Sequence, residues 1–422
     1  TDTTTQALAL RWTALDPSPT LTRAVFRLNR AQNWDEFRAA LQDWDVPPQN
    51  VVYADIDGHI GYCLAGRLPI RRQSDGSLPV PGWSGEYEWA GYIPFVELPS
   101  QLDPPAGALV TANHRIIDER YPTSAPIRGL WLNPYRAQRI QALLDEHKQH
   151  DVRSFARIQG DVVSLPGKAL VEQVARLQLE PGMEQRVRDL FVTWDGHLHP
   201  ESVGGAIYEG LRYHLLRIVY QEISDLFQAP AALGSFSVLP ANIYLECALP
   251  TVLARMASQP LDQPDAWLGQ GRSWGGVLRA ALGRTVAELT ERLGDDPNRW
   301  QYGRLHTLTL RHPLGSVPAL TPLFNRGPWP IGGDLDTVNH CYLPRDNAGM
   351  KITNGVSVRF IFDLNDWDNS RAILPGGQSG HPASPHYADM IAAWRAGAYH
   401  PLLWSRPAVE RHSTQVLTLL AD

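Results

Sequence analysis

Hydrophobic and polar positions divide the chain into three stretches, and the first, up to about residue 110, predicts mainly strands. Apolar residues alternate with polar ones at residues 51–54 and 60–64, and an Asp-Gly turn lies between them, which predicts a β-hairpin. Residues 33–44 (NWDEFRAALQDW) instead place large apolar side chains at helical spacing, behind an asparagine suited to an N-cap. Residues 7–12 predict a short strand.

The middle third of the chain has apolar residues at positions i, i+3 and i+4, the period of an amphipathic helix. Helices are expected there at residues 136–147, 168–177, 183–193, 205–227, 241–257 and 274–292. Strand candidates return at residues 305–310, 337–342, 356–362 and 372–374, followed by a helix at residues 387–396. Strands at both ends with a helical middle predict an α+β fold whose sheets combine distant segments.

Composition adds limits on function. The net charge of −6 is spread over 422 residues without a run of five like charges, which argues against a nucleic-acid partner or an acidic membrane partner. No stretch of 18 apolar residues exists, so no segment is expected to span a membrane. The three cysteines have no metal-ligand spacing. The 14 Trp residues suit either a ligand-binding surface or a large core.

One long motif resembles a known family. Residues 49–71 (QNVVYADIDGHIGYCLAGRLPIR) are similar to a run in the penicillin acylases, which belong to the N-terminal-nucleophile hydrolases. Further blocks agree in order: LPVPG at 78–82 followed by WAG at 89–91, VTANHR at 110–115, YRAQRIQALL at 135–144, WDG at 194–196, and GGQSGHPASPHYADMIAAW at 376–394. The resemblance covers nearly the whole chain and is weakest between residues 225 and 300.

The resemblance implies the four-layer αββα sandwich of N-terminal-nucleophile hydrolases, with a helical insertion. Residues 1–150 and 301–422 are then expected to form two parts of the hydrolase core, and residues 151–300 the insertion.

The resemblance also implies a nucleophile of a particular kind. In this family a serine, freed by autocatalytic cleavage as an N-terminal residue, attacks the substrate, and its own α-amine serves as base. An α-amine titrates at about 7.7–8.0, close to working pH, so no histidine is required. Thr1 is a candidate by residue type, but in relatives the strand similar to residues 7–12 lies far beyond the catalytic serine. The serine is therefore expected on a separate chain or fragment that associates with this one.

Three residues of this sequence match family positions of interest. Asn113 matches the oxyanion-hole asparagine, whose side-chain amide would donate to the tetrahedral intermediate. Arg136 matches an arginine near the active site, where a guanidinium with five fixed donors can orient its neighbours. His114 stands where relatives often have a second asparagine, and it could either face the substrate pocket or lie in the loop without a chemical role.

No cofactor is expected. Some relatives bind calcium, but the loop where one ligand would fall has Thr123, Ser124 and Ala125 and no carboxylate. The cluster His381, His386 and Asp389 has metal-like residue types without a recognised spacing.

Other motifs are discounted. The segment 377–380 (GQSG) lacks the G-x-S-x-G spacing of a nucleophile elbow. The segment 363–368 (DLNDWD) lacks the glycine of a calcium loop. The segment 332–334 (GGD) precedes no phosphate-binding helix.

The expected function is hydrolysis of a small-molecule amide, such as an acylated β-lactam, through an acyl-enzyme on that external serine. Two alternatives remain open: an acyl-homoserine lactone acylase, and a non-catalytic binding protein of the same fold. A carbohydrate-binding protein would rest on tryptophan content alone. By resemblance, the protein is expected in the periplasm or outside the cell.

Overall fold

The computed structural model describes residues 7–16, 20–117, 121, 127, 129, 131–221, 243–342, 351–352 and 354–420. The chain falls into two units, Thr1–Leu132 and Asn133–Asp422.

The predicted hairpin is the centre of the first unit. β1 (Gln49–Ala54) pairs antiparallel with β2 (Ile60–Ala65), and β5 (Ser100–Leu102) pairs with the other edge of β2. The turn between β1 and β2 uses Gly58 at φ +93°, a conformation that favours glycine. A second pair of strands, β3 (Pro69–Arg71) and β4 (Trp89–Tyr92), follows along the chain.

The helix expected after Asn33 is α2 (Trp34–Leu41), and it packs on the hairpin. The Asn33 side chain accepts from the backbone N–H of Glu36 at 3.0 Å, which caps the helix as predicted. Trp34 lies against Gly61 of β2, where a Cβ would overlap its ring. Glycine at this position therefore lets the helix approach the sheet closely.

One expectation for the first unit was wrong, and one helix had not been predicted. Residues 7–12 pair with no strand among the described residues, and Leu8, Leu10 and Trp12 are exposed there. Apolar alternation fits an extended segment, but a strand also needs a hydrogen-bonded neighbour. The helix that had not been predicted is α1 (Thr20–Leu28), which packs against α2.

Helices dominate the first part of the second unit, as predicted. They are α3 (Tyr135–Asp145), α4 (Val152–Gln159), α5 (Leu165–Ala175), α6 (Met183–Val192), α7 (Val203–Val219), α9 (Ile243–Cys247), α10 (Leu249–Ala257) and α11 (Trp274–Leu293). α4 had not been predicted, and the helix expected at residues 241–257 is divided at Ala248, where Pro250 lies in the first turn of α10.

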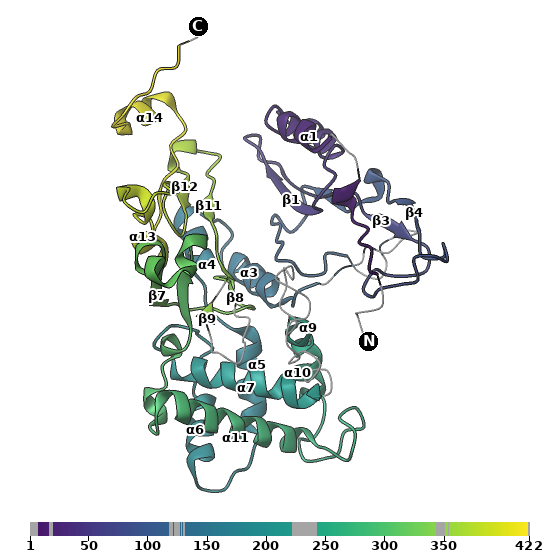
Figure 1. Cartoon of the computed structure of the whole chain (residues 1–422), viewed down its shortest axis with the longest axis vertical. Helices are drawn as coiled ribbons and strands as arrows, with labels where there is room; N and C mark the ends of the chain where they lie inside the picture. The colour runs from purple at the N-terminus through teal and green to yellow at the C-terminus, as the bar shows by residue number, and fades with distance from the viewer. Residues whose placement is uncertain are drawn as a thin grey trace. The chain divides into compact units, whose positions relative to one another are not determined.

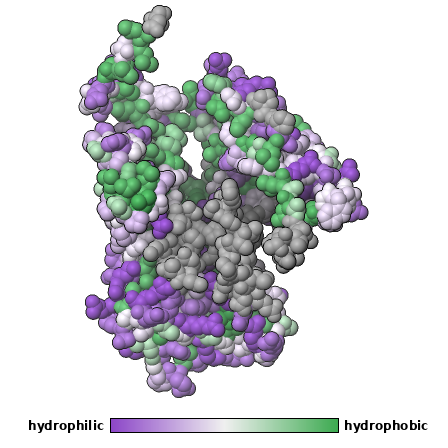
Figure 2. Space-filling view, in the orientation of Figure 1, coloured by the Kyte–Doolittle hydropathy of each residue, from purple (hydrophilic) through white to green (hydrophobic). Residues whose placement is uncertain are grey.

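The long helices α7 and α11 run side by side (Figure 1) and supply much of the apolar core of this unit. Gly210 of α7 lies where the two helices meet, and a Cβ there would come 2.5 Å from Cγ2 of Thr285 in α11. The surface over α6 and α11 is largely hydrophilic in the view of Figure 2, so these helices are amphipathic.

The second unit continues with short strands and helices. β6 (Thr307–Leu310) lies between β7 (Arg326–Pro330) and β9 (Lys351–Ile352), β8 (Cys341–Tyr342) pairs with β10 (Asn354–Gly355), and β12 (Arg371–Ile373) lies between β11 (Arg359–Ile361) and β13 (His400–Pro401). The helices are α12 (Thr321–Phe324), α13 (Ile391–Arg395) and α14 (Arg406–His412). Each expected strand of this part is present: three are shorter than predicted, and the last, β12, is shifted by one residue. Helices with small sheets confirm the α+β class. Every helix among the described residues is too short or too polar to cross a bilayer.

Candidate functional site

The turn that carries Asn113 lies in the first unit, after β5. Asn113 has φ +61°, in the left-handed region, which asparagine adopts more readily than most residues. Its carbonyl oxygen accepts a 2.9 Å hydrogen bond from the backbone N–H of Leu132. Ala112 is buried and Asn113 is exposed. The burial of Ala112 and the hydrogen bond from Leu132 thus anchor the turn at the exposed Asn113, and left-handed non-glycine residues are concentrated at functional sites.

His114 lies in the same turn and is partly buried. Its proximity to Asn113 follows from their adjacency in the sequence. Arg136 belongs to the second unit.

Arg136 occupies the first turn of α3, an unusual place for a cation. The helix has Pro134 at its N-cap, no side-chain capping bond and no acidic residue in its first turn. The positive end of the helix dipole disfavours a cation there. Arg136 is partly buried, and this burial lowers the pKa of its guanidinium, while the charges of Asp336 and Asp334 oppose the lowering. Those two carboxylates therefore stabilise the arginine at this position.

A buried charge cluster surrounds the carboxylates. Arg212 of α7 is only 3% exposed and reaches three carboxylates: Nε lies 2.6 Å from Glu246, and Nη1 and Nη2 lie 2.9 Å from Asp334 and Asp336 respectively. Nη1 also donates to the hydroxyl of Tyr208 at 3.2 Å. Three carboxylates around one guanidinium leave an excess of negative charge, which Arg136 partly offsets.

The pKa of Asp336 shows the effect of burial in this cluster. Burial raises the pKa of Asp336 to about 7, which Arg212 opposes and the negative charge of Asp334 reinforces. Burial likewise raises the pKa of Asp334. Asn133, directly before the N-cap of α3, donates from Nδ2 to Asp336 Oδ1 at 3.1 Å and to the backbone oxygen of Glu246 at 3.0 Å.

The cluster depends on an irregular segment at residues 332–341. Gly333 has φ +84°, and a Cβ there would overlap the backbone oxygen of Asn339. The backbone N–H of Asp334 donates to Thr337 Oγ1, and that of Asp336 donates to Asp334 Oδ1, both at 2.8 Å. His340 closes the segment, and burial together with the positive charge of Arg136 lowers its pKa to about 4.

This cluster had not been predicted from the sequence. Gly332, Gly333 and Asp334 had been considered only as a nucleotide motif, which was discounted. The two aspartates on either side of Leu335 in GGDLDT were the available sign, since buried carboxylates require partners.

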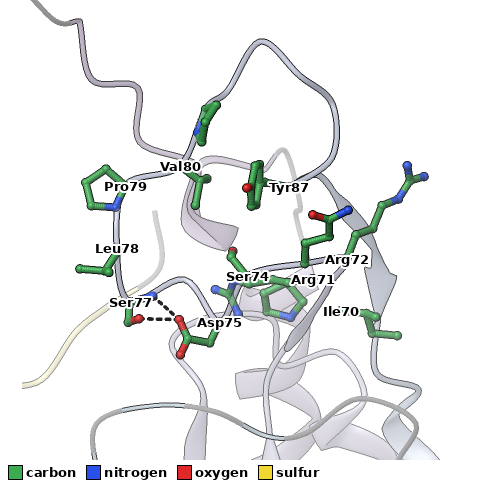
Figure 3. Close-up of a pocket in the computed structure, with 13 residues that line it drawn as sticks. Ile70, Arg71, Arg72, Ser74, Asp75, Ser77, Leu78, Pro79, Val80 and Tyr87 are labelled. Atoms are coloured by element: carbon green, nitrogen blue, oxygen red, sulfur yellow. Dashed lines mark hydrogen bonds between the residues drawn. The ribbon is translucent and has the colours of Figure 1, made fainter.

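The first unit also contains an open cavity of about 760 Å³ (Figure 3). Its lining includes Arg71, Arg72, Asp75 and Tyr87, together with Leu78, Pro79 and Val80 of the LPVPG block. It includes neither Asn113 nor any Trp or Phe among the described residues. This polar lining does not fit an apolar acyl pocket.

The discounted motifs have structural contacts. His386 Nδ1 pairs with Asp389 at 2.8 Å in an exposed position. Asp363 accepts from the backbone of Asn365 and from Asn369 Nδ2 at 3.0 and 2.8 Å. Within the described residues no group of three or more His, Cys, Asp or Glu side chains is arranged to hold a metal ion. Thr123, Ser124 and Ala125, where a family calcium ligand would fall, lie outside the described residues.

Comparison with known proteins gives consistent matches. The penicillin amidase family model matches residues 1–411. The chain is 35% identical to penicillin acylase 2 proenzyme of Pseudomonas sp. (strain SE83) over 94% of this chain and 49% of that protein. It is 32% identical to acyl-homoserine lactone acylase QuiP of Pseudomonas aeruginosa over 89% of this chain and 46% of that protein. The chain thus spans about half the length of these relatives.

The fold also matches a solved structure. Thermostable penicillin G acylase from Alcaligenes faecalis aligns with a TM-score of 0.66 and 17% identity, over 96% of this chain and 73% of that one. The fold predicted from the sequence, that of the N-terminal-nucleophile hydrolases, is confirmed.

Proposed function

The chain belongs to the penicillin amidase family, and from this we propose that it is part of an acylase that hydrolyses the amide of a small molecule. The observation that carries the proposal is Asn113, an exposed asparagine held in a left-handed turn within the family's VTANHR block.

In the proposed reaction, the hydroxyl of an N-terminal serine attacks the amide carbonyl and transfers its proton to its own α-amine. The carboxamide of Asn113 donates to the oxyanion that forms. Collapse of this tetrahedral intermediate expels the amine, which takes up the proton, and water then hydrolyses the acyl-serine by the same route. Arg136 orients groups around the reacting centre.

The substrate class follows from the relatives. Their names include penicillin acylase and acyl-homoserine lactone acylase, and both activities remove an acyl chain from a small polar amine. We propose an acylated β-lactam as the leading substrate and an N-acyl-homoserine lactone as the second candidate. His114, in the same turn as Asn113, is proposed to contact the substrate.

The nucleophile is proposed to lie on another chain or fragment, upstream in the family's order, that assembles with this one. Membership of this family also supports the proposal that the protein is exported to the periplasm or secreted.

Asn113 is tested in the assembled complex, with this chain and the serine-bearing polypeptide together. Asn113→Ala removes the amide donor, and we expect the acylation rate to fall by about 10²–10³. Asn113→Gly is the sharper variant, because glycine adopts φ +61° without strain. If the carboxamide is what matters, Gly is as slow as Ala; if only the backbone conformation matters, Gly restores the rate.

Asn29→Ala is the matched control, since Asn29 is an exposed asparagine of the same unit. Each variant is assayed with one acylated β-lactam and one N-acyl-homoserine lactone, which separates the two candidate substrates. A complex that binds both compounds but hydrolyses neither would favour the non-catalytic binding protein.

A further inference from the structure

The start of α3 is tied to the buried charge cluster by two links. Asn133 donates to Asp336 at 3.1 Å, just before the N-cap of the helix. One turn further on, Arg139 makes a bidentate pair with Asp161 at 3.0 and 2.7 Å. The backbone oxygen of Asp161 accepts a 2.9 Å hydrogen bond from the backbone N–H of Asn339. Because Asn339 belongs to the segment at residues 332–341, this bond connects α3 with that segment.

The side chain of Asp336 makes few polar contacts besides the one with Asn133 within the described part of the chain. It is 2% exposed, and the aligned hydrogen bond that its side chain accepts, within the described part of the chain, comes from Asn133. Its contact with Arg212 Nη2 is an ion pair at 2.9 Å without an aligned hydrogen bond. The geometry of Asp336 is therefore directed toward the start of α3.

The charges around Arg136 also connect Asp336 with the start of α3. The start of α3 does not favour a cation, since the dipole is unfavourable and no acidic residue lies in the first turn. Asp336 is the foremost of the charges that favour its protonated form, followed by Asp334.

We propose that Asp336 is a positioning residue for Arg136, because it holds the first turn of α3 through Asn133 and offsets the guanidinium charge. This inference rests on the proposed role of Arg136 in the acylase reaction. Arg212 and Asp334 in turn fix Asp336, so the cluster acts as a rigid support for the arginine.

The test uses the assembled complex and the variant Asp336→Asn, which keeps the size and the acceptor for Asn133 but removes the charge. We expect kcat to fall about 10- to 100-fold, as a displaced active-site group would cause, while KM changes less than about threefold. The decisive readout is a double-mutant cycle with Arg136→Lys. If Asp336 acts through Arg136, its substitution costs little further rate in the Arg136→Lys background.

Asp265→Asn is the matched control. Asp265 is another buried carboxylate of the second unit, and it accepts from Trp274 Nε1 and from the backbone of Trp267. A general loss of stability would lower the rate in both backgrounds equally. Full additivity of Asp336→Asn with Arg136→Lys would overturn the proposal.

Two further measurements test the positioning role of Asp336 separately from the proposed acylase function. Asn133→Ala removes the donor to Asp336 and leaves every charge in place. It therefore tests the same link if Asp336→Asn fails to fold, and the same non-additivity is expected. A crystal structure of either variant should show Arg136 displaced. If Arg136 is not displaced, the positioning role of Asp336 is contradicted, even if the complex is active. A displaced Arg136 in a complex that hydrolyses no amide supports the positioning role and removes the proposed function.

Discussion

His306 illustrates how a single buried group links stability to pH. Its side chain is fully buried, stacks on Tyr302 with ring centroids 4.3 Å apart, and contacts the backbone oxygen of Ile331 through Nδ1 at 2.8 Å. Burial lowers its pKa from 6.5 to about 4. Between these values the unfolded chain binds more protons than the folded one, so the free energy of unfolding rises with pH. The stabilisation is complete above pH 6.5 and is lost as the pH falls toward 4.

We therefore predict that His306→Gln reduces the acid sensitivity of the protein. At about 1.4 kcal/mol for each pKa unit, the wild type should lose about 2 kcal/mol more than the variant between pH 7 and pH 5, measured by urea unfolding. His400→Gln serves as control, because His400 is exposed in the folded chain. Equal losses for wild type and His306→Gln would contradict the assignment.

At the same scale, the sequence pointed to candidate site residues wherever they lie in a contiguous motif. Asn113, His114 and Arg136 were identified in this way, and their roles stay predictions. The charge cluster could not be predicted from a motif, because Arg212, Glu246 and Asp336 come from three distant segments. Only the fold brings them together, so the GGDLDT segment could indicate buried carboxylates but not which residues pair with them.

Among the elements, helices were predicted better than strands. A helix forms from contacts within a few residues, so its apolar period and its cap are both visible in the sequence, as at Asn33 and α2. A strand depends on a partner elsewhere in the chain. For this reason residues 7–12 remain unpaired among the described residues, and the expected strand at residues 337–342 is reduced to β8 (Cys341–Tyr342), after the buried turn of Asp334 and Asp336.

The contact between α7 and α11 gives a prediction at the scale of elements. Gly210→Ala would gain about 1 kcal/mol of helix propensity, but the new methyl would lie 2.5 Å from Cγ2 of Thr285, which is fully buried and cannot move aside. Overpacking of this kind costs about 1–3 kcal/mol, so the variant should be less stable in chemical unfolding.

Two variants make this test specific. Thr285→Ser removes the methyl that clashes, so the pair Gly210→Ala and Thr285→Ser should recover most of the loss. Gly276→Ala in α11 meets only ordinary contacts at 3.4 Å and should be neutral or slightly stabilising. A Gly210→Ala variant as stable as Gly276→Ala would show that the helices can separate at little cost.

At the scale of the whole molecule, we propose that residues 1–150 and 301–422 are two parts of one hydrolase core and that residues 151–300 are an insertion. The helices from α4 to α11, between Val152 and Leu293, support this division. The chain spans about half the length of its relatives, so the reacting group and its base are proposed to come from the remainder.

The three cysteines are poor nucleophiles at neutral pH. Burial raises the pKa of Cys63 and of Cys247 to about 11, and that of Cys341 to about 12, so all three thiols stay protonated at neutral pH. We predict that this chain alone hydrolyses no amide, and that mixing it with the serine-bearing polypeptide produces activity. Thr1→Ala should leave that activity unchanged.

Mass spectrometry can locate the nucleophile directly. An activated acyl ester should acylate the assembled complex, and the added mass should appear on the serine-bearing polypeptide, because an N-terminal hydroxyl with its own amine as base is the strongest nucleophile available there. Omitting this chain should abolish the labelling, since the oxyanion would lose the donor from Asn113. An acyl group found on this chain instead, and lost in Thr1→Ala, would place the nucleophile here and reverse the proposed division of roles.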